Sequence, residues 1–425
     1  MPNHADIVIV GAGAAGLAAG IFAAETNSEL RIRLLDGAKS IGAKILVSGG
    51  GRCNVTNQKV TASDFHGHRK SIDRILRRFD EQATIRWFDS LGVPLRPENT
   101  GKLFPISNTA RSVLQALLQR CAVLGVSLLP HHRVLDITKD HDMFVLHHSQ
   151  GTLTANQVIL ATGGQSLPKT GSDGSGWRLT TRLGHTLTPI APALVPLLLD
   201  PSFFHANLSG ISHDVMLTTR VNHKMIDRRC GSLLWTHFGI SGPVVLDASR
   251  FWVLAEKHGH NVQLHLNCFP ESTPKDIEQW FMQAAGAPGR KTVESLLAER
   301  LPTRVATHIA QFGQTELAHS TANFLSKENR RALIHMLTDL PLPVIGSRGW
   351  NFAEVTAGGI PLTEINPNTM ASKTVPGLYL IGEMLDCDGR IGGFNFQWAW
   401  STGYLAGQHA ARKQRKEKSP IPQHQ

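Results

Sequence analysis

"DIVIVGAGAAGLAAGIFAAE", residues 6–25, is the stretch that decides the fold. The apolar run from Ile7 to Val10 predicts a buried strand, and the alanine-rich segment after it predicts a helix. Between them stands G-x-G-x-x-G, formed by Gly11, Gly13 and Gly16. Gly11 allows a tight turn, Gly13 lets a pyrophosphate approach the backbone, and Gly16 lets the helix lie close to the sheet. The stretch therefore predicts a dinucleotide site at a helix N-terminus.

An acidic residue follows at the position that such a site requires. The next predicted strand, "LRIRLLDGA" (30–38), ends in Asp36, 20 residues beyond Gly16 (36 − 16). An acid at about this spacing binds a ribose hydroxyl. It favours an adenosine ribose without a 2′-phosphate, so FAD or NAD fits better than NADP.

Two later segments decide between FAD and NAD. A strand from Val158 to Ala161 ends in Thr162 and Gly163, and a strand from Leu378 to Ile381 is followed by Gly382 and Glu383. Together they resemble a flavoprotein pattern, in which an A-T-G strand end supports the cofactor and a late G-[DE] element holds the ribityl chain of FAD. In that pattern the next helix, here from about Gly392 to Phe394, stabilises negative charge on the reduced flavin. Because both ends of the chain bind one cofactor, we expect the middle of the chain to be inserted.

Composition excludes several classes of protein. The chain has 425 residues, 41% of them hydrophobic, so we expect two or three domains. No apolar run reaches the length of a membrane span, and no basic segment precedes the first strand, so we expect a cytoplasmic protein without a membrane partner. The five cysteines show no C-x-x-C spacing and the histidines are scattered, so we expect neither disulfides nor a metal site.

The formal net charge of +10 raises the question of a nucleic-acid partner. Part of the charge lies in the C-terminal "ARKQRKEKSPIPQHQ" (411–425) and part in "HRKSIDRILRRF" (68–79), which has apolar residues at helical spacing. A solvated helix face explains the second stretch better than a surface that follows phosphates. We therefore do not expect a nucleic-acid partner.

Several longer strings resemble one bacterial family of three-domain FAD proteins, the YhiN/HI0933-type flavoproteins. They are "GAKILVSGGGRCNVTN" (42–57), "ATGGQSLPKTGSDGSGW" (161–177), "THFGISGPVVLDASRF" (236–251) and "GLYLIGEMLDCDGRIGGFNFQWAWSTGYLAG" (377–407). The resemblance implies an α/β fold: a two-dinucleotide-binding, Rossmann-like FAD domain with an inserted β-rich domain and a small helical domain. The expected parts are 1–190 with 350–412 (FAD), 191–270 with 340–349 (β-rich), 271–339 (helical) and a flexible basic tail, 413–425.

The resemblance also implies which residues bind non-covalent FAD. The pyrophosphate and the adenosine would be held by Gly11, Gly13, Ala14, Ala15, Gly16, Asp36 and, through its backbone, Val134. The loop that wraps the cofactor would supply Lys44, Ser48, Gly49, Gly50, Gly51, Arg52, Cys53, Asn54 and Asn57. The A-T-G strand end would supply Thr162 and Gly163. The ribityl and isoalloxazine end would meet Gly382, Glu383, Asp388, Gly392, Gly393, Phe394 and Asn395.

Two features allow more than one interpretation. Cys53 follows an arginine, yet no second cysteine stands near it, so a packed thiol is favoured over a redox-active one. The aromatic residues near the C-terminus, with Trp235, could pack in the core or line an apolar substrate pocket over the flavin, and we expect at least two to line it: Trp235, Phe394, Phe396, Trp398 and Trp400.

The expected chemistry is hydride transfer through flavin N5 to or from a small organic substrate. Family assignments imply two directions: an NAD(P)H-linked reductase of an activated double bond, or an oxidase of an amine or aminoketone. NAD(P)H enters as a transient reductant, because the sequence has no second strand–G-x-G-x-x-G–helix unit. A non-catalytic flavin scaffold or an RNA-associated flavoprotein is the alternative. Neither a catalytic acid or base nor an oligomeric state can be assigned from the sequence.

Overall fold

The computed structural model describes residues 3–286, 291–313 and 320–418. The chain divides into two compact units. Unit 1 runs up to Ile190 and resumes at Val355, and unit 2 comprises Ala191–Glu354. Unit 1 thus draws on both ends of the chain.

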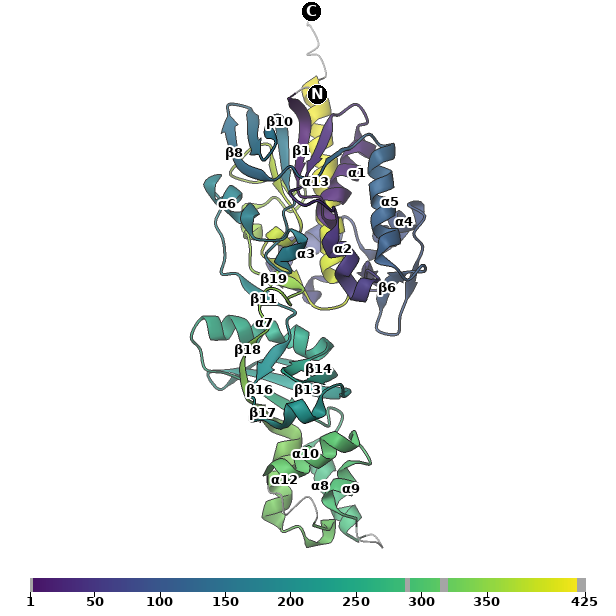
Figure 1. Cartoon of the computed structure of the whole chain (residues 1–425), viewed down its shortest axis with the longest axis vertical. Helices are drawn as coiled ribbons and strands as arrows, with labels where there is room; N and C mark the ends of the chain where they lie inside the picture. Colours follow the sequence, from purple (N-terminus) through teal and green to yellow (C-terminus); the bar gives the residue numbers. More distant parts are fainter. Residues whose placement is uncertain (1–2, 287–290, 314–319, 419–425) are drawn as a thin grey trace, which may run out of the picture. The chain divides into compact units, whose positions relative to one another are not determined.

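Unit 1 is built on a mostly parallel sheet with strand order β7-β2-β1-β10-β9-β8 (Figure 1). At its centre, β1 (His4–Val10) pairs in parallel with β2 (Ile32–Leu35) and β10 (Gly151–Leu160). The edge strands are β7 (Ser127–Leu129) and β8 (Val134–Asp140), the latter pairing with β9 (Met143–His148). The expected Rossmann-like sheet is confirmed, and β1 begins at His4, three residues earlier than the apolar run predicts.

On the side away from β1, strand β10 pairs with two different strands. The first half of β10 pairs antiparallel with β9, and its last three residues pair in parallel with β20 (Leu378–Leu380). The parallel part of the sheet therefore includes strands from the N-terminal, middle and C-terminal segments.

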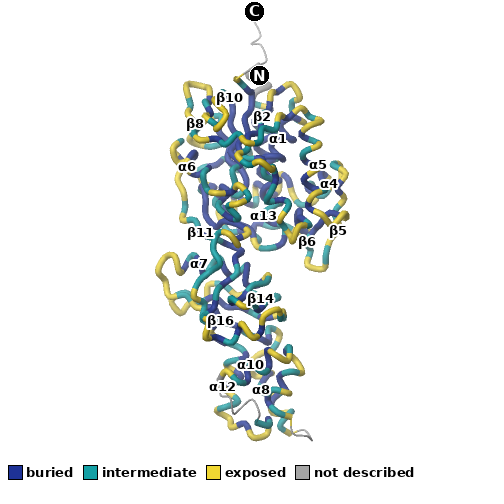
Figure 2. Tube along the Cα trace, in the orientation of Figure 1, coloured by how far each residue is buried: buried dark blue, intermediate teal, exposed yellow. Residues whose placement is uncertain are grey.

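Two helices from opposite ends of the chain pack against each other in unit 1. Helix α1 (Ala14–Thr26) is buried from Ala15 to Ala24 and lies beside α13 (Phe394–Lys418) (Figures 1 and 2). A Cβ on Gly403 would lie 2.7 Å from the Ala15 carbonyl oxygen, and one on Gly407 would lie 2.4 Å from that of Ala19. Close approach of the two backbones therefore requires glycine at both positions.

The remaining elements of unit 1 surround this core. They are α2 (Ala43–Val47), the short 3-10 helix η1 (Ser48–Gly51), β3 (Thr56–Asn57), β4 (Phe65–Gly67), α3 (Arg69–Leu76), α4 (Glu81–Ser90), β5 (Leu95–Pro97), β6 (Lys102–Pro105), α5 (Ala110–Val123), α6 (Ser175–Arg182), β19 (Val355–Ala357) and β21 (Cys387–Gly389). Residues 419–425 of the expected basic tail lie outside the described part, whereas the backbone of α13 is described to Lys418.

Unit 2 contains an antiparallel sheet of order β17-β16-β13-β14-β15-β12-β18. Its strands are β12 (Leu197–Leu199), β13 (Ser212–Val221), β14 (Lys224–Thr236), β15 (Gly239–Ser241), β16 (Val262–Asn267), β17 (Leu340–Leu342) and β18 (Val344–Ser347). Helix α7 (Pro243–Lys257) packs on this sheet through Val244, Val245 and Trp252.

The helical segment of unit 2 contains α8 (Pro274–Gly286), α9 (Val293–Leu297), α10 (Thr303–Gly313) and α12 (Lys327–Asp339). Ser326 caps α12, because its Oγ accepts a hydrogen bond from the Asn329 amide. Buried residues of these helices, such as Phe281 and Leu337, belong to the same hydrophobic cluster as Leu264 and Trp235 of the sheet. The β-rich and helical segments therefore share one core.

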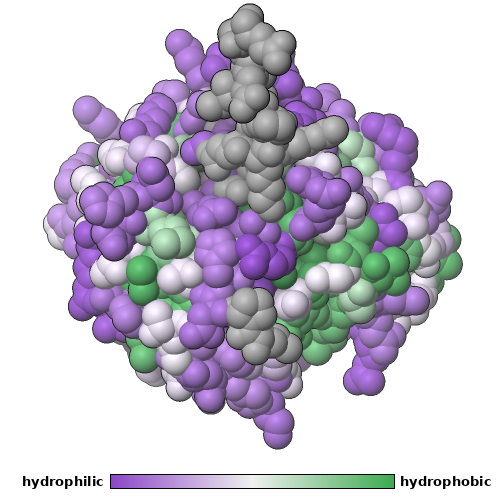
Figure 3. Space-filling model, turned by 90° about the horizontal axis from the view of Figure 1, so that it is seen from above, coloured by the Kyte–Doolittle hydropathy of each residue, from purple (hydrophilic) through white to green (hydrophobic). Residues whose placement is uncertain are grey.

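Hydrophilic residues cover most of the face shown in Figure 3, and hydrophobic residues gather in one part of it.

Within the residues described, no helix is both long enough and apolar enough to cross a membrane.

Candidate functional site

The three glycines of the first turn have different physical roles. Gly11 has φ +102°, and a Cβ there would lie 2.4 Å from the Ala161 carbonyl oxygen. A Cβ on Gly16 would lie 1.9 Å from the Gly11 carbonyl oxygen. A Cβ on Gly13, in contrast, would meet no heavy atom within 4 Å. Packing of the polypeptide therefore requires Gly11 and Gly16, whereas the space at Gly13 is left open, as a bound pyrophosphate needs.

The structure connects Asp36 to this turn. One carboxylate oxygen accepts a hydrogen bond from the Ala12 amide at 2.7 Å, and the other accepts one from the Ala38 amide at 2.7 Å. Asp36 directly follows β2, which pairs with β1. Asp36 and the glycine turn therefore lie at the carboxyl ends of neighbouring parallel strands. Ligands of open α/β sheets bind at this edge.

The glycine-rich loop after α2 has a backbone that only glycine adopts readily. Gly49, Gly50 and Gly51 all have positive φ, between 54° and 83°. A Cβ on Gly50 would meet no heavy atom within 4 Å, as at Gly13. Ser48, at the start of this turn, donates its hydroxyl to the Ile45 carbonyl oxygen at 2.7 Å.

Two asparagines attach this loop to the turn before α13. Asn57 donates from its side-chain amide to the Gly392 carbonyl oxygen at 2.9 Å. With the Asn54 amide oriented to satisfy its neighbours, its oxygen accepts from the Gly393 amide and its nitrogen donates to the Thr56 carbonyl oxygen, both at 2.9 Å. Segments 54–57 and 392–393, both assigned to the cofactor, thus form one hydrogen-bonded unit.

Arg52 and Cys53 are held by protein groups. The Arg52 guanidinium donates to Glu98 at 2.6 Å and lies over the Phe104 ring, 4.0 Å from its centroid. Cys53 is fully buried, and burial raises the pKa of its thiol to about 12. A protonated, buried thiol is a packed residue and not a nucleophile.

A network around Glu383 brings together four chain segments. Lys44 Nζ lies 2.5 Å from Glu383 Oε2. Glu383 Oε1 accepts from the Ser166 hydroxyl at 2.7 Å and from the Thr356 amide at 2.9 Å. The Thr356 hydroxyl accepts in turn from the Gln165 amide at 2.8 Å. Sequence reasoning identified Lys44 and Glu383 but missed Ser166 and Thr356, for which no local motif exists.

The A-T-G strand end and the Gly382 turn are both closely packed. Thr162 lies against α6, since a Cβ on Gly176 would lie 1.9 Å from its Oγ1, and Gly163 has φ +74°. The Gly382 amide donates to the Thr402 hydroxyl at 3.1 Å, and its φ is +71°. These contacts fix both turns, and β20, which precedes Gly382, pairs with β10, which precedes Thr162.

The other predicted residues take the following positions. Asn395 closes a ring with Gly389, accepting from its amide and donating to its carbonyl oxygen, each at 2.8 Å. Asp388 is buried in β21, opposite His66 of β4. Phe394 is the first residue of α13, and Val134 is the first residue of β8.

The expectation of an aromatic pocket is wrong for four of its five members. Trp235, Phe394, Trp398 and Trp400 are all buried to within 1% exposure, and Trp235 belongs to unit 2. The indole groups of Trp398 and Trp400 donate to the carbonyl oxygens of Gly382 and Val55. Burial of large aromatic surfaces in the core competes with pocket lining, and here burial prevails. Phe396 is partly buried and stacks on Trp400.

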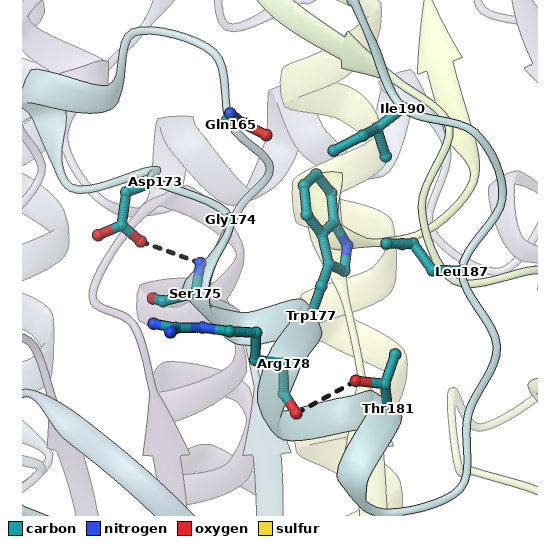
Figure 4. Close-up of a pocket in the computed structure, with 9 residues that line it drawn as sticks. All are labelled: Gln165, Asp173, Gly174, Ser175, Trp177, Arg178, Thr181, Leu187 and Ile190. Atoms are coloured by element: carbon teal, nitrogen blue, oxygen red, sulfur yellow. Dashed lines mark hydrogen bonds between the residues drawn. The ribbon is translucent and has the colours of Figure 1, made fainter.

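A cavity of about 360 Å³ lies beside α6 (Figure 4). The indole of Trp177 points toward Ile190, with Leu187 beside it, and polar groups of Gln165 and Asp173 lie on the other side. None of the residues predicted for the cofactor lines this cavity. It is connected to the Glu383 network through the Gln165 amide.

Comparison with known proteins shows the family of the chain. Residues 5–409 match the family described as "HI0933-like protein Rossmann domain". The chain is 33% identical to the 3-dehydro-bile acid delta(4,6)-reductase of Clostridium scindens, over 96% of this chain and 99% of that protein. It is 32% identical to the ribosomal RNA dihydrouridine synthase of Escherichia coli, over 95% of this chain and 97% of that protein.

Solved structures support the fold. Quinol fumarate reductase from E. coli superposes with a TM-score of 0.52 at 17% identity, covering 99% of this chain and 72% of that one. The 3-ketosteroid delta1-dehydrogenase of Sterolibacterium denitrificans gives 0.52 at 13% identity, covering 97% and 100%. Together with the full-length relatives, the family match identifies an FAD-dependent oxidoreductase. The chain belongs to the HI0933-like family.

Proposed function

We propose that the protein reduces a carbon–carbon double bond conjugated to a carbonyl group, and that its substrate is a uracil base of ribosomal RNA. The product would be dihydrouridine. The observation that carries this proposal is the match over nearly the whole chain to ribosomal RNA dihydrouridine synthases of E. coli and Haemophilus influenzae, at 32% and 31% identity. These names remove the support for our expectation that nucleic acid is not a partner. RNA therefore becomes the proposed substrate.

The relatives also support reduction over oxidation. One relative is named a delta(4,6)-reductase of a 3-dehydro-bile acid and another a dihydrouridine synthase. A 3-oxo-4,6-diene and uracil each contain a C=C bond conjugated to a carbonyl group, and forming dihydrouridine from uridine saturates that bond. The oxidase alternative has no such support. NAD(P)H is proposed as a transient reductant, because the sequence lacks a second glycine motif for a dedicated nicotinamide domain.

The chain's own residues would bind and orient the cofactor. When bound, FAD supplies hydride transfer. Gly13 leaves room for the pyrophosphate, and Asp36, held by two backbone amides, keeps its remaining lone pairs for ribose hydroxyls. The Glu383 network would hold the ribityl end, with the Lys44 ion pair orienting the carboxylate. The asparagine-bonded turn at 392–393 would place the first backbone amides of α13 toward the flavin.

A second candidate substrate is a steroid-like enone, favoured by the 33% identity to the bile acid reductase over nearly the full length of both chains. Uracil and the enone share the same reacting group. They differ in the charge of the whole substrate, because uracil in RNA is attached to a chain of negatively charged phosphates. The net charge of +10 on the protein favours RNA, which is a polyanion.

The test uses ribosomal RNA from a strain that lacks this gene. The FAD-loaded protein is incubated with that RNA and NADH or NADPH, and nucleosides are then analysed by mass spectrometry. We expect a uridine product heavier by two hydrogens, formed by the wild type and by the surface control Asp89→Ala but much less by Asp36→Ala. Reduction of a 3-oxo-4-ene steroid without any change in the RNA would favour the second substrate and contradict the first.

A further inference from the structure

Helix α3 (Arg69–Leu76) separates apolar and basic residues onto two faces. Ser71, Ile72, Ile75 and Leu76 are buried, and the two isoleucines are fully inaccessible. Arg69, Lys70 and Arg74 are exposed, as is Arg78 two residues beyond the helix. At 100° per residue Arg69, Lys70 and Arg74 lie on the half of the helix opposite the buried face, and Arg78 follows the end of the helix. We call Arg69, Lys70, Arg74 and Arg78 the α3 surface.

The charges of this surface are not neutralised by neighbouring acids. Within the described part of the chain, Arg77 pairs with Asp73 at 3.0 Å, whereas none of the four residues forms an ion pair. Two acids near α3 have other partners. Asp64 binds Arg390 at 2.8 Å, and Asp80 caps α4 by accepting from the Ala83 amide at 2.7 Å.

Helix α3 is connected through its buried face to the turn at 392–393, which we expect to lie at the flavin. On the buried face of α3, Ile72 reaches Gly67 of β4, where a Cβ would lie 3.2 Å from the Ile72 side chain. Strand β4 pairs with β21, so that Gly67 stands opposite Cys387 and Phe65 opposite Gly389. Gly389, the last residue of β21, is hydrogen-bonded to Asn395, and beyond the strand Gly392 is hydrogen-bonded to Asn57. Two hydrogen-bonded strands therefore connect α3 to the 392–393 turn.

We propose that the α3 surface binds the phosphates of an RNA strand and so holds the substrate base near the flavin end of the site. This inference rests on the proposed function. Four free cations spread over about two helical turns suit a series of phosphates, whereas a small uncharged substrate would need none of them. A phosphate contact carries no sequence information, so this surface would position the RNA and not select the base.

An anionic membrane is the other polyanion that a basic helix could meet. Helices that bind a bilayer surface insert an apolar face next to the basic one. The apolar face of α3 is already buried in unit 1, because Ile72 and Ile75 have no exposed area. The structure therefore favours RNA as the occupant.

The experiment compares two charge-neutralised forms of the full-length, FAD-loaded protein. The test variant is Arg69→Gln, Lys70→Gln, Arg74→Gln and Arg78→Gln. The matched control, Lys224→Gln, Arg228→Gln, Lys275→Gln and Arg331→Gln, removes the same charge from exposed positions of unit 2. Fluorescence anisotropy with a fluorescein-labelled 20-nucleotide oligouridine gives Kd from 50 to 200 mM salt. Melting temperature and flavin reduction by NADPH verify that each variant is folded and competent.

We expect the test variant to bind at least about 10-fold more weakly at 100 mM salt, with the slope of log Kd against log salt reduced by about 2.8, at ~0.7 per phosphate contact. The control should change Kd by less than about 3-fold. Equal affinity and equal salt slopes for the test variant and the wild type would overturn the proposal that the α3 surface binds RNA. So would wild-type binding to vesicles with anionic lipid but not to oligouridine.

Turnover separates this inference from the function on which it rests. If the wild type forms dihydrouridine in ribosomal RNA and the test variant does so equally well, the role proposed for the α3 surface is wrong and the proposed function stands. If the wild type forms none, the proposed function fails, whatever the oligouridine affinity.

Discussion

Lys44 and Glu383, 339 positions apart in the sequence, form an ion pair with 2.5 Å between Nζ and Oε2. Both side chains are mostly buried, with 29% and 18% of their area exposed. The pair joins α2, near the N-terminus, to the turn that follows β20. It therefore makes the site depend on residues from both ends of the chain.

Breaking this pair should weaken FAD retention. Lys44→Met leaves the Glu383 carboxylate without its counter-charge, whereas Lys44→Met with Glu383→Gln leaves neither charge unpaired. We expect a coupling of about 0.5–3 kcal/mol in a double-mutant cycle of thermal stability. Flavin content after gel filtration should fall in Lys44→Met and stay unchanged in the exposed control Lys59→Met. Additive effects of the two substitutions would show that the pair contributes nothing.

Alanine at Gly13 and alanine at Gly16 should have opposite effects. Gly16→Ala places a Cβ 1.9 Å from a backbone oxygen, so the fold should lose about 1–3 kcal/mol or more. Gly13→Ala meets no protein atom within 4 Å, so the flavin-free protein should melt like the wild type but retain less FAD. Calorimetry of flavin-free protein and FAD titration measure the two effects. Normal FAD affinity of Gly13→Ala would contradict the pyrophosphate assignment.

Cysteine reactivity should follow burial. Burial raises the pKa of Cys53, Cys121 and Cys268 to about 12, so these thiols stay protonated at pH 8. Cys230 is exposed. N-ethylmaleimide at pH 8 should label Cys230 first in the native protein, and peptide mass spectrometry locates the label. Labelling of Cys53 at a similar rate would reopen a redox role for that thiol.

Glu364 should contribute a pH-dependent part of the stability. Partial burial alone would raise the pKa of Glu364, but hydrogen bonds from Thr186 and His185 outweigh burial and lower it. A lowered pKa stabilises the fold above the ordinary carboxylate pKa of ~4.3, and this stabilisation is lost as the pH falls. Glu364→Gln should therefore cost about 1–3 kcal/mol at pH 7 and less at pH 3.5.

Thermal unfolding at the two pH values tests this expectation for Glu364. The exposed Glu29→Gln is the control, since its side chain has no such partners. A cost that is the same at both pH values would mean that the Glu364 charge is not stabilised by folding.

Local motifs predicted the parts of the site that local geometry determines. The turn at Gly11, Gly13 and Gly16 and the position of Asp36 depend on one strand, one turn and one helix, so the sequence contains the full pattern. Helical spacing of apolar residues likewise predicted a helix within residues 68–79, where the structure has α3 (Arg69–Leu76). The same spacing shows that a helix buries a face but not which surface covers it. The shared core of the sheet and helices in unit 2 was therefore not predictable.

Contacts between distant segments were beyond sequence reasoning. Ser166 and Thr356 carry no motif, and their place beside Glu383 follows from how four segments pack. The same holds for Asn54 and Asn57. The resemblance implied that both bind the cofactor, and the structure adds the glycine turn before α13 as a partner. The prediction that aromatic residues line a substrate pocket failed because a hydrophobic side chain suits the protein core as well as an apolar pocket wall. Its residue type does not distinguish the two places.

The pairing of β10 with both β1 and β20 affects how the protein matures on the ribosome. Translation proceeds from the N-terminus, and unit 2 is complete once Glu354 has been synthesised. Unit 1 at that moment still lacks β20 and α13, so α1 has α5 beside it, but the part of its surface that α13 covers is unprotected. The inserted unit can fold first. Because residues 382–395 are expected to bind FAD, we expect the nascent chain to acquire its cofactor only after these residues have been synthesised.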